Sequence, residues 1–376
     1  MSTRSARTEG NAVPTAFSKD SVAMNHARPA PLVSLLLPAY NEAAIVEKNL
    51  ATLYEYMQSL EKEYRWEIVI VNDGSKDNTG ELIEAFARAR KNVQVIHHPT
   101  NFGLGQALKT GFNHCRGDYI VTMDVDLSYS PDHIRRLLAK MRDTGAKIVL
   151  ASPYMKGGGV SSVPKLRRVL SIGANRFLSF AARGNLSTLT GMVRAYDGRF
   201  LKTLNLKSMG MEVNPEVIYK AKMLRARIEE IPASLDWHLQ RTTAPTRKSS
   251  MKVLRHTMSV LLSGFLFRPV MFFIVPGLLS LLLSLYANAW VLIHSVDHWG
   301  RLSQYPTFST RASAAVAGAF AEAPHTFIIG GMTLMVAIQM ISLGILALQS
   351  KQYFEEVFHL GTTIFRNARE RGEENQ

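Results

Sequence analysis

Short apolar runs alternate with longer amphipathic stretches from residue 31 onwards. The apolar runs are of strand length and predict β-strands at Leu32–Leu37, Glu67–Val71, Val93–Ile96, Tyr119–Met123 and Lys147–Ala151. The stretches between them place apolar residues at helical spacing and predict helices at Glu42–Leu60, Asn78–Arg90, Gly105–Cys115 and Pro131–Thr144. Strand and helix in regular alternation are typical of an α/β fold with a doubly wound, mostly parallel sheet.

The region after this alternation, from Val163 to about Pro232, is expected to be more helical and to end in a strand at Arg227–Ile231. Residues 251–268 then carry apolar side chains on one face and basic residues beside it. This pattern predicts an amphipathic helix that lies in the plane of a membrane surface. An ordinary helix packed on the preceding domain is the alternative.

Residues 269–296 and 326–349 are two long apolar runs without Lys, Arg, Asp or Glu. Both exceed the roughly 20 residues that a helix needs to cross a hydrocarbon core, so we predict two transmembrane helices. Pro276 is expected to kink the first helix, and Gly330–Gly331 would allow close helix contact in the second.

Basic residues flank the two runs: Arg268 precedes the first and Lys351 follows the second. The positive-inside rule then places residues 31–250 and the basic tail 350–376 in the cytoplasm, with 297–325 as the outer loop. This topology suits an integral protein of a bacterial inner membrane.

The chain of 376 residues has a formal net charge of +14. Such an excess of cations suits nucleic acid, an anionic membrane or a phosphorylated substrate, and the apolar runs favour the last two over nucleic acid. Cys115 is the only cysteine, so we expect a buried structural thiol in a reducing compartment. Residues 1–30 lack the apolar core of a signal peptide and are expected to form a disordered tail.

Polar groups follow three of the predicted strands, at Pro38–Glu42, Asn72–Asp77 and Asp124-Val-Asp126. Ligands of a doubly wound sheet bind at the carboxyl ends of its strands, so we expect these groups to lie together. Two carboxylates at a strand end can hold a hard divalent cation that in turn holds a diphosphate. Asp73 can accept hydrogen bonds from a base or ribose. An Asp-x-Asp pair alone is a weak signal, and its place after a buried strand strengthens it.

These segments together resemble the family-2 glycosyltransferases, and most closely the dolichol-phosphate mannose synthase-like branch that acts on polyprenyl phosphates. The resemblance covers residues 31–250. It depends on six motifs in order, at Pro38–Glu42, Asn72–Thr79, Asn101–Gly105, Asp124–Asp126, Arg167–Asn175 and Val193–Tyr196. Two apolar spans after an interfacial helix also look like bacterial members of this branch.

The resemblance implies a GT-A-type fold and an inverting transfer of a hexose from a nucleotide sugar, GDP-mannose or a UDP-sugar, to a polyisoprenyl phosphate. It implies nucleotide binding by Pro38, Tyr40, Glu42, Asp73 and Asp124. It places Mg²⁺ or Mn²⁺ at Asp124 and Asp126, with Ser128 at the third ligand position. It assigns the sugar diphosphate and the lipid phosphate to Arg167 or Arg168, Arg194, Arg241, and Arg247 or Lys248. Asp124, Asp126 and Arg194 would be the catalytic residues.

The chain departs from the family pattern at Ser128, where some members have a metal-binding Gln, and at Pro153, which replaces a usual Arg. An ion pair with Asp197 or a nearby carboxylate is the structural alternative for Arg194. His97 and His98 are expected to face solvent rather than bind metal, because no carboxylate lies at suitable spacing.

Two other functions stay open. A processive membrane polysaccharide synthase would carry Gln-x-x-Arg-Trp after the core, but Arg65-Trp66 lies too early and lacks the Gln. A non-catalytic membrane partner of a glycan export system would be expected to have lost Asp124 or Asp126, and both are present. A homo-oligomer is compatible with either function and with transfer to a lipid carrier.

Overall fold

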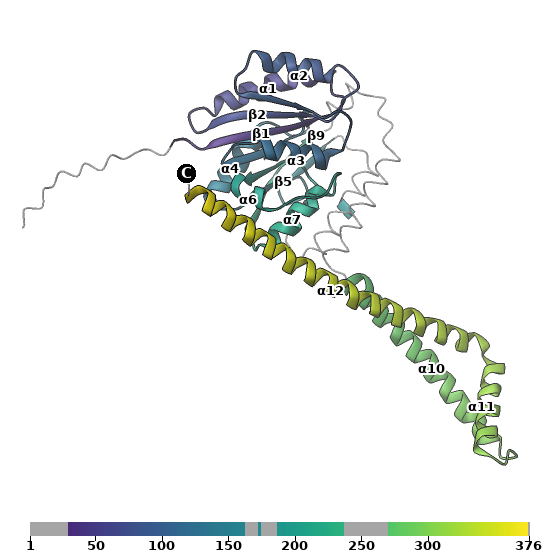
Figure 1. The fold of residues 1–376 in the computed structure, drawn as a ribbon. Coiled ribbons are helices and arrows are strands. Elements are labelled where there is room, and N and C mark those ends of the chain that lie inside the picture. The colour runs from purple at the N-terminus through teal and green to yellow at the C-terminus, as the bar shows by residue number, and fades with distance from the viewer. Residues whose placement is uncertain (1–28, 162–171, 174–185, 237–269, 375–376) are drawn as a thin grey trace, which may run out of the picture. The chain divides into compact units, whose positions relative to one another are not determined.

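The structure is a computed structural model, and it describes residues 29–161, 172–173, 186–236 and 270–374. The residues from Pro31 onwards form one unit, in which a seven-stranded sheet is flanked by helices (Figure 1). The strands of this sheet are β1 (Leu32–Ala39), β2 (Arg65–Asn72), β3 (Val93–His97), β4 (Tyr119–Thr122), β5 (Ile148–Ser152), β7 (Arg194–Asp197) and β8 (Ile228–Pro232). The helices around it are α1 (Val46–Ser59), α2 (Thr79–Arg88), α3 (Leu104–His114), α4 (Asp132–Thr144), α6 (Gly198–Thr203) and α7 (Val213–Met223).

The strand order is β3-β2-β1-β4-β7-β5-β8, and the predicted mostly parallel, doubly wound α/β sheet is confirmed. The five early strands, the four early helices and the late strand all form within a few residues of their predicted bounds. The exception is β7, which runs antiparallel between β4 and β5 in a region that was expected to be helical. A second, two-stranded sheet pairs β6 (Gly159–Ser161) with β9 (Ser234–Asp236).

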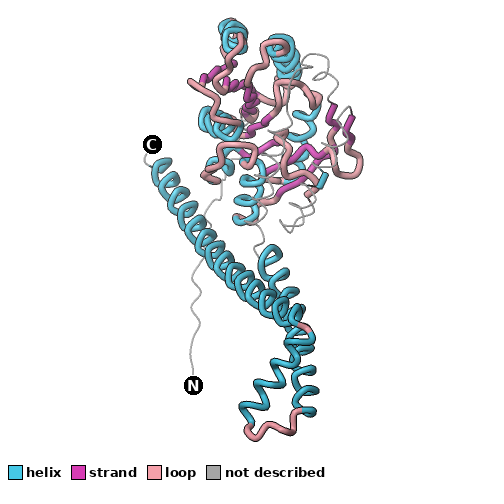
Figure 2. The backbone as a smooth tube through the Cα atoms, turned by 90° about the vertical axis from the view of Figure 1, so that its right-hand side faces the viewer, coloured by secondary structure: helices cyan, strands magenta, loops and turns pink. Residues whose placement is uncertain are grey.

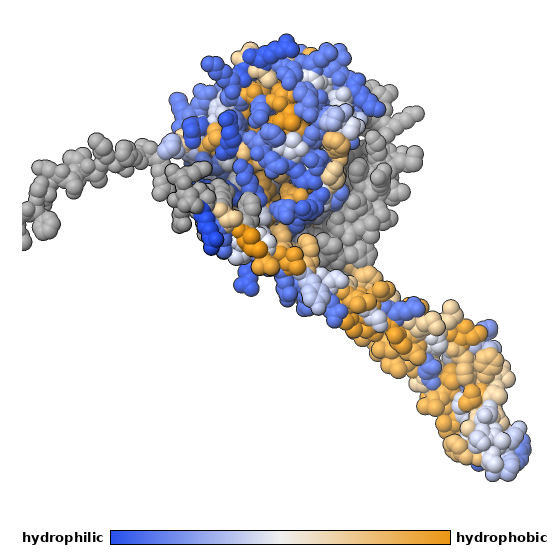
Figure 3. Space-filling model, in the orientation of Figure 1, coloured by the Kyte–Doolittle hydropathy of each residue, from blue (hydrophilic) through white to orange (hydrophobic). Residues whose placement is uncertain are grey.

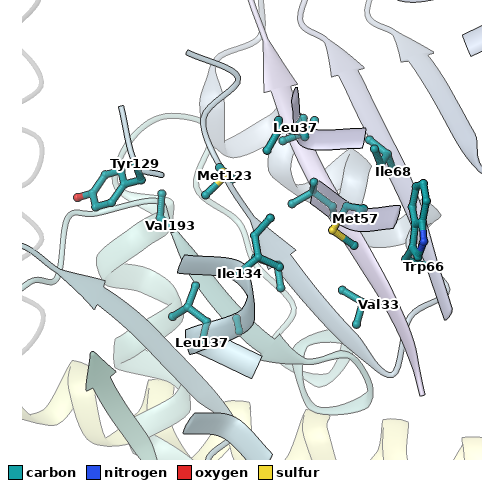
Figure 4. Packing of buried hydrophobic residues seen from close by; sticks show 14 of the residues in the cluster. Val33, Leu37, Met57, Trp66, Ile68, Met123, Tyr129, Ile134, Leu137 and Val193 are labelled. Carbon is teal, nitrogen blue, oxygen red and sulfur yellow. The ribbon is translucent and has the colours of Figure 1, made fainter. Parts of the chain in front are cut away.

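Alternation along β1 divides the core between the two faces of the sheet. Leu35 and Leu37 belong to the cluster under α1, α2 and α4, part of which is drawn in Figure 4. Leu36, between them, belongs to the opposite cluster with Phe112 of α3. Because side chains alternate across a strand, a run of apolar residues fills both faces and fixes the register of the strand ends. Cys115 is buried in the second cluster, as predicted.

The apolar runs form two helices that are long and apolar enough to cross a membrane, over Val270–Arg301 and Pro324–Ile364. The first comprises π-helical Val270–Ile274 and α10 (Val275–Arg301); the second lies within α12 (Pro324–Glu374). Figure 3 shows hydrophobic side chains gathered on the surface of these helices.

The segments between and after the two apolar runs are also helical. The expected outer loop is partly helical, with α11 (Phe308–Glu322) beside α10 (Figure 2). The Thr307 side chain caps it by accepting from Thr310 N. The expected tail continues α12 without a break. Pro276 lies directly after the π-helical turn within the helix Val270–Arg301, and the expected kink there stays a prediction.

Close packing between the two long helices occurs at Gly330. Ser284 Oγ donates to the Gly330 carbonyl at 2.9 Å, and a β-carbon at Gly330 would lie 3.2 Å from the Asn288 amide. The predicted contact is therefore confirmed at Gly330, whereas a β-carbon at Gly331 would meet no atom within 4 Å. The amphipathic helix predicted at 251–268 lies outside the described residues, as do residues 1–28 of the predicted tail.

Candidate active site

The loops after β1 and β2 are bonded to each other. Asn41 has a positive φ of 55°, and its backbone N donates to Ser75 Oγ at 3.0 Å. In return Lys76 N donates to Asn41 Oδ1 at 2.8 Å. Glu42 N donates to Thr79 Oγ1 at 2.8 Å. These bonds bring two predicted motifs together at one edge of the sheet, with Tyr40 partly buried on the first loop.

Asp73 is buried and its carboxylate holds the chain after β3. Its oxygens accept from Phe102 N at 3.0 Å, from Gly103 N at 2.8 Å and from Asn101 Nδ2 at 3.0 Å. His98 Nδ1 lies 2.7 Å from the same carboxylate, and His98 Nε2 lies 2.9 Å from Thr110 Oγ1. Asp73 thus fixes the Asn101–Gly105 motif next to the loop that carries Asn72–Asp77.

The expectation that both histidines face solvent is wrong for His98, because the side chain of this residue is only 8% exposed. His97 is exposed and contacts Asn72 and Glu84. Sequence spacing missed the buried His98–Asp73 pair because β2 and β3 bring together residues that lie far apart in the chain.

Glycines let another segment approach the start of α3. Gly103 has a φ of 96°, and a β-carbon there would lie 2.9 Å from the Met209 carbonyl oxygen. A β-carbon at Gly105 would lie 2.6 Å from backbone atoms of Ser208 and Met209. The glycines of this motif therefore permit a close backbone approach, and the approaching segment is 208–210.

Asp124 and Asp126 follow β4, which pairs with β1. Asn49 Nδ2 of α1 donates to the Val125 carbonyl at 2.9 Å and fixes the turn from behind. Leu127 has a positive φ of 53°, a costly conformation for a residue with a β-carbon. Ser128 N donates to Asp126 Oδ1 at 2.9 Å, so the turn aims the second carboxylate.

The acidic side chains at this edge repel one another. Burial, followed by the nearby carboxylates of Asp126 and Glu42, raises the pKa of Asp124 to about 8. A hard divalent cation prefers oxygen ligands of this kind and would relieve the repulsion, so the residues fit such an ion in their chemistry. Across the described ranges no group of three His, Cys, Asp or Glu side chains forms a ready-made metal cluster. The two aspartates would therefore need further ligands from substrate, water or other oxygens.

Arg194 is fully buried at the start of β7, next to Thr122 of β4. Its guanidinium donates to the carbonyls of Leu189 at 2.6 Å, Gly191 at 2.8 Å and Asn214 at 2.9 Å. Burial lowers the pKa of this guanidinium from its ordinary value.

Among the described residues, no ion pair with a carboxylate is found for Arg194. Asp197 pairs with Lys147 at 2.6 Å and caps α6. The bonds of Arg194 to backbone carbonyls, rather than to phosphate or carboxylate, were not foreseen from the sequence.

The segment 187–192 is held at almost every residue. Glu230 accepts from Ser187 N at 2.8 Å and from Thr188 N at 2.9 Å. Asn214 Nδ2 donates to the Thr190 carbonyl at 3.1 Å. Thr122 Oγ1 donates to the Met192 carbonyl at 2.6 Å, only two residues before Asp124. This segment is thus a fixed backbone wall next to the acidic turn, and Arg194 and Glu230 build it.

The remaining predicted phosphate ligands lie outside the described residues: Arg167, Arg168, Arg241, Arg247 and Lys248. The structure therefore brings together Glu42, Asp73, Asp124, Asp126 and the Arg194 wall at one edge of the sheet. Glu230 and Asn214 complete this wall and were not predicted as site residues.

Residues 34–204 match the family model described as Glycosyl transferase family 2. The family resemblance predicted from the motifs is therefore confirmed for the α/β domain, and the match covers less than half of the chain. Polyprenyl-phosphate transferases are among the curated relatives, which supports this branch of the family.

Two of these relatives have similar identity to the chain. A dolichyl-phosphate beta-glucosyltransferase from Trichomonas vaginalis is 29% identical over 215 residues, covering 55% of this chain and 65% of the relative. A dolichol-phosphate mannosyltransferase from Pyrococcus furiosus is 28% identical over 227 residues, covering 60% of this chain and 62% of the relative. The match thus spans less than two thirds of each relative.

Solved structures show more distant similarity. Glucosyl-3-phosphoglycerate synthase from Mycobacterium tuberculosis, with Mn²⁺, UDP and glucosyl-3-phosphoglycerate, is 20% identical with a TM-score of 0.46, covering 62% of this chain and 80% of that one. A mannosyltransferase from Pyrobaculum calidifontis, in complex with GDP-Man and Mn²⁺, is 15% identical with a TM-score of 0.40, covering 89% of this chain and 86% of that one.

Proposed function

We propose that the protein is a glycosyltransferase that moves a hexose from a nucleotide sugar to a polyisoprenyl phosphate, with inversion at the anomeric carbon. The observation that carries the proposal is the acidic turn Asp124–Asp126, which lies at the same sheet edge as the Glu42 loop. The family-2 domain and its polyprenyl-phosphate relatives support the reaction class. GDP-mannose or a UDP-sugar is the proposed donor.

The donor nucleotide would lie against the paired loops after β1 and β2. Pro38, Tyr40 and Glu42 on the first loop are proposed to contact the nucleoside. Asp73 is also proposed to contact it, and its four hydrogen-bond partners suggest that it acts mainly by holding the Asn101–Gly105 turn in place. Polar atoms fixed in this way lose little entropy when a nucleotide binds.

Asp124 and Asp126 are proposed to hold Mg²⁺ or Mn²⁺, with Ser128 at the third ligand position. When bound, the ion would neutralise the leaving diphosphate. The attacking phosphate of the carrier is already largely anionic at neutral pH, since its second pKa is near 6, and needs no strong general base. What the chain must supply is fixed positive charge for that phosphate. We propose that this charge comes from Arg167, Arg168, Arg241, Arg247 and Lys248.

Arg194 is proposed to act as a positioning residue. Its guanidinium is fully buried, so a direct bond to a phosphate would require the groups that cover it to move. By holding 187–192 beside the acidic turn, it would shape the wall against which the sugar and the acceptor phosphate lie. This role replaces direct phosphate contact as the simpler reading of the geometry.

The two apolar helices support a place in the membrane, which is where a polyisoprenyl carrier is found. We propose that the α/β domain lies on the cytoplasmic side of a bacterial inner membrane. The basic residues that flank the spans favour this orientation.

The experiment that tests the function is a transfer assay with the full chain in detergent or bilayer discs. Labelled GDP-mannose, UDP-glucose and UDP-N-acetylglucosamine would each be offered with undecaprenyl or dolichyl phosphate and Mg²⁺ or Mn²⁺. Formation of a labelled lipid with one donor supports the proposal. Donor hydrolysis without lipid product, or polymer growth beyond one sugar, would contradict it.

A further inference from the structure

A partly open cavity of about 1030 Å³ lies away from the strand-end site. It is lined by α3, by the chain from α6 to α7 and by the part of α12 that follows the apolar run. The α12 wall includes Phe354, Phe358 and Gly361. None of the lining residues belongs to the loops that carry Glu42, Asp73 or Asp124.

One lysine of the cavity is neutralised within the protein. Lys220 Nζ lies 2.6 Å from Glu216 Oε1 and 2.6 Å from the Asn205 carbonyl. The Glu216 carboxylate also accepts from Lys207 N and Ser208 N, both at 2.8 Å. This pair contributes no net charge to the cavity.

Three further lysines line the cavity: Lys109, Lys202 and Lys207. Lys109 Nζ donates to the Lys207 carbonyl and to Met209 Sδ, which are neutral acceptors. In the described part of the chain, no ion pair is found for Lys109, Lys202 or Lys207. Among the described residues that line the cavity, the remaining acid is Glu212, whose carboxylate accepts from Gly210 N at 3.1 Å. The cavity therefore has an excess of positive charge.

The opposite wall is apolar. Phe354 stacks on Tyr219 of α7 at 6.4 Å between ring centroids and on Phe358 at 6.3 Å. Val357 completes this wall. Cations on one side and hydrocarbon on the other suit an amphiphile with an anionic head.

The position of the cavity along α12 indicates which kind of amphiphile would lie beside it in a membrane. At 1.5 Å per residue, Phe354 lies about 8 Å beyond the end of the apolar run at Gln349. The headgroup region of a bilayer extends roughly 5–8 Å beyond the hydrocarbon core on each side. If α12 spans the membrane as proposed above, the cavity opens at the depth of phospholipid headgroups.

We propose that this cavity binds the headgroup of an anionic phospholipid, with its phosphate among Lys109, Lys202 and Lys207 and its upper chain against Phe354, Val357 and Phe358. The site would fasten the α/β domain to the membrane surface beside α12. The proposal depends on the membrane placement but not on the transfer reaction, so it can hold or fail independently of that activity.

The test is lipid retention by the full chain in detergent, measured by native mass spectrometry with phosphatidylglycerol or phosphatidylcholine as the probe. Two variants address the cavity. Lys202→Gln with Lys207→Gln removes charge, and Gly361→Leu fills space, because a β-carbon at Gly361 would meet no atom within 4 Å. The control is Lys62→Gln with Lys91→Gln, which removes two exposed lysines outside the cavity lining. Melting temperatures would verify that each variant is folded.

We expect the wild type to retain phosphatidylglycerol over phosphatidylcholine, and the double cavity variant to retain about tenfold less phosphatidylglycerol. Gly361→Leu should weaken retention without a change in charge, and the control pair should behave as wild type. Equal retention of both lipids, or equal losses in cavity and control variants, would overturn the proposal. In two further measurements, inorganic phosphate or undecaprenyl phosphate is added to the protein. Displacement by free phosphate alone, or retention of undecaprenyl phosphate only, would also overturn the assignment to a phospholipid.

Discussion

Arg194 and Glu230 hold the same backbone segment from two different strands. The arginine of β7 donates to the Leu189 carbonyl at 2.6 Å, and the carboxylate of β8 accepts from Thr188 N at 2.9 Å. Two charged side chains are thus used to fix a short stretch of main chain next to the acidic turn. Fixed polar groups of this kind are costly to remove, since each deletion leaves buried backbone groups without partners.

Arg194→Ala is expected to lower the free energy of unfolding by about 3 kcal/mol or more, because three carbonyls lose their donor. Nucleotide affinity should stay near normal while transfer falls by roughly two orders of magnitude, as positioning near the reacting groups is lost. Arg199→Ala, which removes an exposed arginine of α6, is the control. Denaturant melts, calorimetry and transfer rates would be compared. Normal stability with lost transfer would instead favour direct phosphate contact.

Glu230→Gln should weaken the same segment, since the amide offers only one acceptor oxygen for Ser187 N and Thr188 N. Because both residues hold 187–192, the double variant with Arg194→Ala should be less destabilised than the sum of the two single variants. A double-mutant cycle of unfolding free energies measures this coupling. Strict additivity would show that the two residues act on separate parts of the fold.

Asp126→Asn is expected to lower transfer by more than about 10²-fold, because a charge that would hold the cation is removed. Excess chelator should abolish activity of the wild type, and Mg²⁺ or Mn²⁺ should restore it. Asp132→Asn, in the exposed first turn of α4, serves as the matched control. Full wild-type activity in chelator would exclude the metal assignment.

The membrane topology can be tested with single cysteines at Ser303 and Arg371. The natural Cys115 is buried, and burial raises the pKa of its thiol to about 12, so Cys115→Ser removes a poorly reactive background. The two new thiols should label from opposite sides of sealed vesicles, because Ser303 follows α10 and Arg371 lies near the end of α12. Labelling from the same side would refute a hairpin with both ends in the cytoplasm.

Stability should fall in acid partly through Glu216. Burial alone would raise the pKa of this carboxyl, but hydrogen bonds from Lys220, Ser208 and Lys207 outweigh it and lower the pKa below the ordinary 4.5. A lowered pKa means that the ionised form stabilises the fold above pH 4.5, and that this contribution is lost as pH falls through the folded value. Glu216→Gln should therefore destabilise the protein at pH 7 and much less at pH 3. Melting curves at both pH values measure the difference, and an equal loss at both would contradict it.

The early strands and helices could be predicted because their periodicities are long and unbroken. β7 could not, since four residues carry little pattern and their strand conformation comes from pairing with β4 and β5. The helix α11 could not be predicted for a different reason, because its Ala-rich sequence has no strong polar face. The only local sign of a helix start is Thr307, which caps it.

The candidate site, like the fold, could be predicted from the sequence only in part. Acidic residues at strand ends could be placed from sequence because parallel strands end at one edge. The partners of Arg194 and His98 could not, because residue type does not tell whether a guanidinium meets a phosphate or a carbonyl. Those partners come from Leu189, Asn214 and Asp73, which only the fold brings near.

The position of β7 has a consequence for the order in which the domain can assemble. Strands β3, β2, β1 and β4 form one ribbon and β5 and β8 another, and β7 is the strand that joins them. The ribosome makes β4 and β5 well before β7, so the two halves of the sheet cannot close until Arg194–Asp197 has been synthesised. All seven strands precede the first apolar helix, and domains generally fold as units with N-terminal ones first. The sheet can therefore be completed before the chain offers either helix to a membrane, with the strand that joins its two halves among the last to be made.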